Sequence, residues 1–274
     1  MSINKLIFFS SLIFLISSCD EKTLQNINVS GESIRDRIIC PFGYSRENYD
    51  KSSWQYFLQN LNLKPNGSKI LDFTGEPIFN QKGHVGIIDY DIGKKDLQQC
   101  ADAIIRLRAE YLYKQQEYND IEFKFTSGHN YRWIDYAKGI RPSIDGNKVT
   151  FKQNAKTDSS YSSFRNYLDI IFMYAGTISL NRDLEKIPRN NNFEIGDIII
   201  KAGSPGHAVL VVDRVRDNQG NYLYLLAEGY TPAQSIHILK SGKSNISPWF
   251  KIDKQGSISS KRFYFSNPNI RRFN

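Results

Sequence analysis

The stretch from Asp96 to Leu112 constrains the fold of this chain more than any other part. It contains no glycine or proline, and Gln99 follows Asp96 by three residues, as in a helix-capping box. Its apolar side chains recur at helical spacing and form a wide stripe, made of Leu97, Cys100, Ala101, Ile104, Leu107, Ala109, Tyr111 and Leu112. We therefore expect a helix over about residues 96–114 with one face buried in the core.

The rest of the chain adds a second helix and then a series of strands. Asp158, Ser159 or Ser160 can cap a helix over about 159–175, and Gly176 follows it in the position of a C-terminal glycine. The apolar runs beyond it are typical of strands, at 195–201, 207–214, 222–228, 235–239 and 262–265. Helices that precede strands with short links favour an α+β fold over alternating layers. We expect a single globular domain, 37–274, with both helices packed on an antiparallel sheet.

The N-terminal segment, residues 1–18, has the layout of a secretory signal. Lys5 precedes an apolar run of about ten residues, too short to remain as a membrane-spanning helix. The run ends at Ile16-Ser17-Ser18-Cys19, which resembles the lipobox of bacterial lipoproteins. This resemblance implies that Cys19 is acylated and becomes the new N-terminus. The alternative is an ordinary signal peptide with a chance cysteine.

Residues 19–36 are polar and hold no aromatic side chain, so we expect a tether between the anchor and the domain. The expected location is the cell envelope, on the periplasmic face or the outer surface, with the membrane as a partner through the lipid anchor. The formal net charge of +8 favours anionic surfaces such as cell-wall polymers or acidic glycans. The chain has no block of five or six basic residues, and nucleic acid is not expected as a partner.

Three of the four histidines give little indication of a chemical role. His84, His129 and His237 show no metal-ligand spacing, so we expect neither a metal nor a cofactor. The oligomeric state is left open.

The chemistry is expected in the C-terminal strands. A strand with a Gly-Asp pair leads through a glycine-rich loop, 202–206, into His207 and an apolar strand. This order is similar to the histidine region of NlpC-like and CHAP amidases, papain-fold enzymes that cut peptide bonds in peptidoglycan. The resemblance implies a papain-like fold in which the histidine lies beside a cysteine at a helix N-terminus. A third polar residue on the next strand orients the imidazole; Glu228 is the expected one, with Gln234 as the fallback.

Cys100 is the candidate nucleophile. In NlpC-like enzymes the cysteine begins the helix that corresponds to 159–175, where this chain has only serines. Cys100 instead lies in the first turn of the earlier helix, where free N–H groups and the helix dipole favour a thiolate. It precedes His207 and Glu228 in papain order, with His207 as the base and Glu228 as its orienting residue.

Several alternatives to this site remain open at this point. Gln99 is the candidate oxyanion donor, although Gln98 is also possible. Cys100 is otherwise a buried apolar residue or the disulfide partner of Cys40. A serine-based site near residues 160–163 is the other possible arrangement.

Long stretches of the chain closely resemble a family of bacterial lipoproteins built around a domain of unknown function. The resemblance covers residue 38 to the C-terminus and rests on Pro41-Phe42-Gly43-Tyr44-Ser45-Arg46, Asp96-Leu97-Gln98-Gln99-Cys100-Ala101-Asp102-Ala103, Arg106-Leu107-Arg108-Ala109-Glu110-Tyr111-Leu112, Tyr174-Ala175-Gly176-Thr177-Ile178-Ser179-Leu180, Gly206-His207-Ala208-Val209 and Pro232-Ala233-Gln234-Ser235-Ile236-His237-Ile238-Leu239. It implies a lipoprotein of one domain and supplies no activity. One position departs from the family pattern, because Glu228 stands where glutamine is expected.

Two functional hypotheses follow. The first is a papain-fold thiol hydrolase or amidase that acts on cell-wall peptides at the membrane. The second is a non-catalytic envelope module of the same fold that binds peptidoglycan or another anionic polymer. Trp133, Arg141 and Gln234 are the candidate binding residues, since aromatic and basic side chains can line a sugar or peptide groove, although such an aromatic run is more often core. A Cys40–Cys100 disulfide would favour the second hypothesis.

Overall fold

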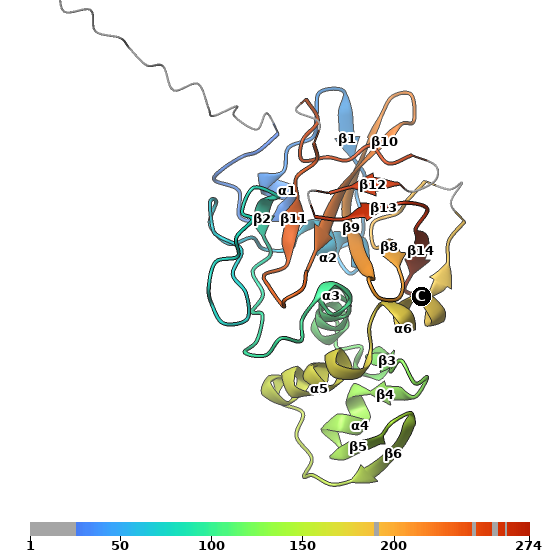
Figure 1. Cartoon of the computed structure of the whole chain (residues 1–274). Coiled ribbons are helices and arrows are strands. Elements are labelled where there is room, and N and C mark those ends of the chain that lie inside the picture. Colours follow the sequence, from blue (N-terminus) through green and yellow to red (C-terminus); the bar gives the residue numbers. More distant parts are fainter. Residues whose placement is uncertain (1–25, 189–191, 243–244, 254–256, 261) are drawn as a thin grey trace, which may run out of the picture.

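An antiparallel sheet, built largely from the C-terminal part of the chain, forms the centre of the molecule (Figure 1). The computed structural model describes residues 26–188, 192–242, 245–253, 257–260 and 262–274. The strands lie in the order β2-β11-β10-β9-β8-β14-β7, and β1 pairs with β9. They are β1 (Tyr44–Arg46), β2 (His84–Ile87), β7 (Glu185–Lys186), β8 (Ile198–Lys201), β9 (His207–Asp217), β10 (Tyr222–Glu228), β11 (His237–Leu239) and β14 (Asn269–Arg272). The α+β fold with an antiparallel sheet is thus confirmed.

The central strands are apolar on both faces because each face is covered. Along β9, Ala208, Leu210 and Val212 pack in the main core with the helices, while Val209 and Val211 face a second apolar cluster. The second cluster includes aromatic side chains of the C-terminal segment, which carries β12 (Ile258–Ser259) and β13 (Tyr264–Phe265). Successive side chains of β9 point to opposite faces of the sheet, and both faces are covered. For this reason the β9 sequence is a nearly continuous apolar run.

Helix α3 (Cys100–Lys114) lies across the sheet and contacts β9 and β10 (Figure 1). It begins at Cys100 rather than at Asp96, so the predicted start was four residues too early. Gln99 is the N-cap residue, and its backbone N–H donates to Asp102 Oδ2 at 3.1 Å. The Asp96 carboxylate instead accepts a hydrogen bond from the backbone N–H of Ala233 at 2.7 Å. The Asp96 side chain, which the sequence pattern predicts as the helix cap, therefore makes a tertiary contact with Ala233 instead.

Residues 118–174 form a smaller unit below the sheet, which we call the aromatic lobe (Figure 1). It contains η1 (Tyr118–Asp120), β3 (Glu122–Lys124), β4 (Asn130–Arg132), α4 (Trp133–Ala137), β5 (Ile140–Asp145), β6 (Lys148–Gln153) and α5 (Tyr161–Tyr174). Ser160 is the cap of α5, since its hydroxyl accepts from the backbone N–H of Ser163. Gly146, with φ of 57°, lies in the turn between β5 and β6.

The start of the described chain packs on the domain. Asn26 Nδ2 donates to the carbonyl of Ser247 at 2.9 Å, Ile27 bridges to Ile38, and α1 (Ile34–Arg37) follows. Residues 26–36 of the predicted tether are therefore part of the folded unit. The predicted signal peptide, 1–18, and Cys19 lie outside the described residues. The remaining helices are α2 (Trp54–Gln59) and α6 (Thr177–Asp183).

No helix within the described ranges is long and apolar enough to cross a membrane.

Candidate active site

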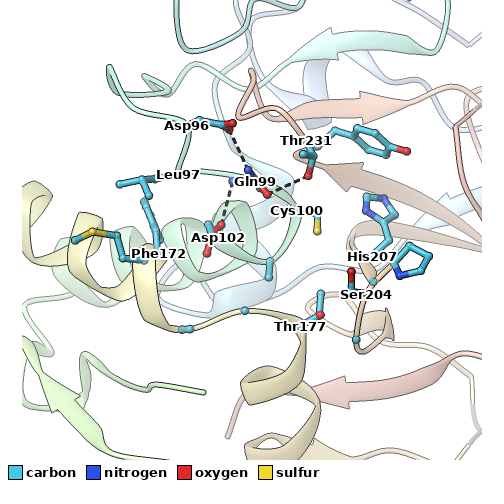
Figure 2. Close-up of a pocket in the computed structure, with 18 of the residues that line it drawn as sticks. Asp96, Leu97, Gln99, Cys100, Asp102, Phe172, Thr177, Ser204, His207 and Thr231 are labelled. Atoms are coloured by element: carbon cyan, nitrogen blue, oxygen red, sulfur yellow. Dashed lines mark hydrogen bonds between the residues drawn. The ribbon is translucent and has the colours of Figure 1, made fainter. Parts of the chain in front are cut away.

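A cavity of about 590 Å³ opens where the N-terminus of α3 meets the sheet and the connection between α5 and α6. Cys100, at the first position of α3, and His207, at the first position of β9, both line it. In Figure 2 the Cys100 sulfur lies on the side of the helix that faces the His207 ring. The structure thus brings the predicted nucleophile and base into one site, although more than a hundred residues separate them in the chain.

Glu228 lies behind His207, at the end of the neighbouring strand β10. His207 Nε2 and Glu228 Oε2 are 2.7 Å apart, and both side chains are almost fully buried. Burial alone would raise the pKa of Glu228, but the close contacts of its carboxylate with the His207 and His237 rings lower it to about 2. Glu228 is therefore a carboxylate at neutral pH, and its contact requires a hydrogen on His207 Nε2. The third predicted residue is in place.

The contact with Glu228 fixes which ring nitrogen of His207 serves Cys100. Since Nε2 is bound to the carboxylate, Nδ1 is left for the thiol. Burial alone would lower the pKa of His207, but hydrogen bonds with Cys100 and Glu228 raise it to about 9. The ring is also enclosed by the aromatic rings of Tyr230, Phe263 and Phe265, with centroids 4.8–5.6 Å away. These walls limit the rotation of the imidazole.

Cys100 is a partly exposed free thiol, and the structure disagrees with both the disulfide and the serine-based site. Cys40 and Cys100 are free thiols, so no disulfide joins them. Cys40 instead lies near Arg46, whose Nη1 is 3.6 Å from the Cys40 sulfur. Ser160 is occupied as a helix cap, and no serine of residues 160–163 is among the cavity-lining residues.

Gln99 lines the cavity, but its amide is already engaged. Its Nε2 donates to Asp96 at 3.0 Å, and its Oε1 accepts from the hydroxyl of Thr231 at 3.0 Å (Figure 2). The backbone N–H of Cys100 offers a better oxyanion donor, because the first residue of a helix has no intrahelical acceptor for its N–H. The sequence prediction missed this donor because it began the helix at Asp96.

The neighbouring carboxyl group of Asp102 is also buried in the first turn of α3. Burial raises the pKa of Asp102 well above its usual value, although the backbone N–H of Gln99 acts in the opposite direction. Burial thus disfavours a full negative charge on Asp102 next to the Cys100 sulfur. Asp102 also caps the helix through its bond with the backbone N–H of Gln99.

A glycine allows the end of β10 to approach α3. A Cβ atom at Gly229 would lie 2.7 Å from the carbonyl oxygen of Gln99 and 2.8 Å from the Cβ of Ala103. This close approach sets Glu228 and Tyr230 on either side of the contact with α3. The Glu228-Gly229-Tyr230 string was a signal for the cavity wall that sequence reasoning did not use.

The three predicted binding residues do not line this cavity. Trp133 is 2% exposed and packs against Phe164 and Tyr167 in the aromatic lobe. Arg141 stacks on the ring of Tyr136 in the same lobe. Gln234 is 1% exposed and forms a backbone bridge with Asp72. The structure thus does not bring these three residues to the cavity of Cys100 and His207.

Within the part of the chain that the structure describes, no group of three or more His, Cys, Asp or Glu side chains is arranged to hold a metal ion.

Residues 34–272 match the family described as "Domain of unknown function (4846)". Because this match covers most of the chain, the protein belongs to that family. A comparison with curated proteins found no match, and a comparison with solved structures found none.

Proposed function

We propose that this member of the family is a cysteine hydrolase that cleaves amide bonds in cell-wall peptides. The observation that carries the proposal is the cavity shared by Cys100, at a helix N-terminus, and a His207 ring that is bound to Glu228 through Nε2. A thiol, a base and a residue that orients the base are the parts that nucleophilic catalysis needs. A cysteine on a helix, followed in the chain by a histidine and a carboxylate on adjacent strands, supports a papain-like arrangement.

The reaction starts from a thiolate and an imidazolium. The Cys100 sulfur attacks the amide carbon, and the carbonyl oxygen becomes an oxyanion that accepts from the backbone N–H of Cys100. His207 Nδ1–H gives its proton to the leaving nitrogen as the C–N bond breaks, which leaves a thioester. His207 then takes a proton from water, the hydroxide attacks the thioester carbon, and the thiolate leaves with the imidazolium restored.

Glu228 supports both halves of this cycle. Its carboxylate holds the hydrogen on Nε2, so that Nδ1 stays directed at the sulfur and the substrate. Its negative charge also stabilises the imidazolium that must exist before the proton is donated. A carboxylate at this position therefore performs the orienting role that a glutamine performs by hydrogen bonding alone.

The cavity wall fits a peptide segment. Leu97, Phe172 and Met173 supply apolar surface, and Thr177 and Ser204 supply hydroxyl groups near Cys100 (Figure 2). A concave site with apolar walls and a few polar groups suits a main-chain amide with a small side chain. The net charge of +8 suits the anionic polymers of a cell envelope, where the lipobox-like Cys19 would anchor the chain.

Cleavage of purified muropeptides tests the enzymatic proposal. The wild type should release peptide fragments and react with a thiol-directed probe, and Cys100→Ala and His207→Ala should lose the cleavage by at least about a thousandfold. Cys40→Ala is the matched control, because Cys40 is the other free thiol of the described chain and lies outside the cavity. Cleavage that survives both Cys100→Ala and His207→Ala would leave only a binding role for this site.

The anchor is tested separately. Cys19→Ser should leave unprocessed precursor, because a serine hydroxyl cannot form the thioether that carries the lipid. Membrane fractionation and the mass of the N-terminal peptide report the result. A variant that is processed and fractionates like the wild type would contradict lipid anchoring.

A further inference from the structure

A second buried histidine reaches the proposed catalytic carboxylate from the opposite side. Strand β11 pairs with β10 so that His237 is the register partner of Glu228. His237 Nε2 lies 3.3 Å from Glu228 Oε1, while Glu228 Oε2 is bound to His207. All three side chains are nearly inaccessible to solvent. The carboxylate is thus held between two imidazole rings, with one oxygen facing each ring.

The other nitrogen of His237 fixes the hydrogens of its ring. His237 Nδ1 lies 2.9 Å from the carbonyl oxygen of Ser235. A carbonyl can only accept, so Nδ1 must carry a hydrogen. If Nε2 carried none, its lone pair would face the negative oxygen of Glu228. A hydrogen on each nitrogen, as in an imidazolium, would suit the two contacts together.

Glu228 Oε1 depends on this ring. Within the described residues no donor makes a well-aligned hydrogen bond to this buried oxygen. The 3.3 Å separation of His237 Nε2 and Glu228 Oε1 is long and poorly aligned for a hydrogen bond. The interaction between the two groups is therefore mainly electrostatic. A buried carboxylate with one oxygen unbalanced would be costly to keep ionised.

The surroundings of His237 include one further titratable ring. His84, on the adjacent strand β2, lies edge-on to His237 with the ring centroids 6.1 Å apart. Burial and the positive charge of His237 lower the pKa of His84 to about 4, so His84 is neutral at neutral pH. Arg262 lies close enough to act on His84 in the same direction. His84 therefore adds no charge of its own to this cluster.

We propose that His237 is a positioning residue: its imidazolium balances Oε1 of Glu228, and so keeps that carboxylate ionised and turned toward His207. This proposal rests on the proposed function, because it assigns His237 a part in orienting the base. It adds a fourth residue, which does not touch the substrate, to the Cys100–His207–Glu228 set. It also explains why the in-register position opposite Glu228 is polar in a strand that is otherwise buried and apolar.

The test compares His237→Gln with His84→Gln. Both replace a histidine of the same small cluster, but only the first removes a charge that faces Glu228. His237→Gln should lower kcat for peptide cleavage about ten- to hundredfold, the range expected for loss of an interaction with a charged group, with little change in KM. His84→Gln should leave both within about twofold. Equal losses in the two variants would reduce His237 to a packing residue.

A second readout needs no catalysis. In protein labelled with ¹³C at glutamate carboxyl groups, the Glu228 signal, assigned with Glu228→Gln, should titrate near pH 2 or stay ionised down to the pH of unfolding. In His237→Gln its midpoint should move up toward the ordinary value near 4.5, and in His84→Gln it should not move. His237→Asn serves the same measurement if His237→Gln does not fold. An unmoved Glu228 titration in a folded His237 variant overturns the proposal, whether or not cleavage is ever detected.

Discussion

Helix α3 carries two buried polar clusters, and they differ in whether their hydrogen-bonding groups are all occupied. At the N-terminus of the helix, Cys100 and His207 meet at a cavity. Two turns further on, Arg106 forms an ion pair with Glu110 at 2.6 Å, and the Arg106 side chain is fully buried. Both clusters combine buried charge with perturbed pKa values, so neither feature alone marks an active site.

The Arg106 cluster has its donors occupied. Arg106 also donates to Gln98 at 3.2 Å and to Asp91 at 3.0 Å, and the Tyr161 hydroxyl donates to Glu110. Burial alone would lower the pKa of Arg106, but Glu110 and Asp91 raise it. These bonds join α3 to α5 and to the segment before α3, and neither Arg106 nor Glu110 lines the cavity. The cluster therefore holds elements together.

The Cys100 cluster keeps a reactive atom free. One nitrogen of His207 is committed to Glu228, and the other faces a thiol at the edge of a space large enough for a peptide segment. The difference between the two clusters indicates that an active site needs a reactive atom without a fixed partner next to a cavity, in addition to buried charge. Substitutions in the two clusters should accordingly affect different measurements.

The largest expected effect is on stability, at Arg106. Arg106→Ala leaves Glu110 buried without its partner, which should lower the free energy of unfolding by about 3–5 kcal/mol. Urea denaturation measures this change. The double variant Arg106→Met with Glu110→Leu is the control, because replacing a whole buried pair with apolar side chains should restore much of the loss. A single variant as stable as the wild type would contradict the structural role of the cluster.

Glu228→Gln should affect catalysis more than stability. A glutamine can still accept from His207 Nε2, but it has no charge to support the imidazolium, so kcat should fall about ten- to hundredfold. Steady-state cleavage of a muropeptide measures the change. Glu122→Gln is the matched control, since Glu122 is an exposed glutamate bonded to Asn130 outside the site. Unchanged kcat in Glu228→Gln would remove the carboxylate charge from the mechanism.

The proton on His207 should make both activity and stability fall in alkaline solution. The pKa of His207 is about 9 in the folded protein and near 6.5 when unperturbed. The folded state therefore holds this proton more tightly, and the resulting stabilisation is complete below about pH 6.5 and lost as the pH rises through about 9. Cleavage should fall over the upper part of the same range because the leaving nitrogen no longer receives a proton. Rate and urea-unfolding profiles that stay flat to about pH 10 would contradict this assignment.

The smallest effect is expected in the aromatic lobe. Arg141 stacks on Tyr136 away from the cavity, so Arg141→Gln should leave muropeptide cleavage unchanged and alter the free energy of unfolding by about 1 kcal/mol or less. Cleavage and denaturation assays on the one variant measure both. A loss of cleavage beyond about tenfold would show that this lobe takes part in substrate binding after all.

The sequence predicted the fold best where local patterns decide it. Strand β10 coincides with the predicted range 222–228, and the α5 cap is one of the three predicted residues. The start of α3 was missed because the Asp96 side chain bonds to Ala233, far along the chain, and no local pattern reveals that contact.

The residues of the candidate site likewise fall into those that local sequence patterns indicate and those that depend on tertiary contacts. Cys100, His207 and Glu228 were found because each lies at the end of an element, and ends of elements are visible in the sequence. The sequence could not show that Trp133 and Arg141 lie away from this cavity, because an aromatic run has the same composition in a groove and in a core. His237 was missed as part of the site because its partnership with Glu228 depends on the register between β10 and β11.

The titration of His207 tests the Cys100–His207 pair most directly. In protein labelled with ¹⁵N-histidine, the His207 ring signals should titrate with a midpoint near pH 9 in the wild type. In Cys100→Ala the midpoint should fall, because the hydrogen bond with the Cys100 side chain is among the causes that raise it. A wild-type midpoint at or below 6.5, or one that is unchanged in Cys100→Ala, would show that the thiol and the imidazole are not coupled.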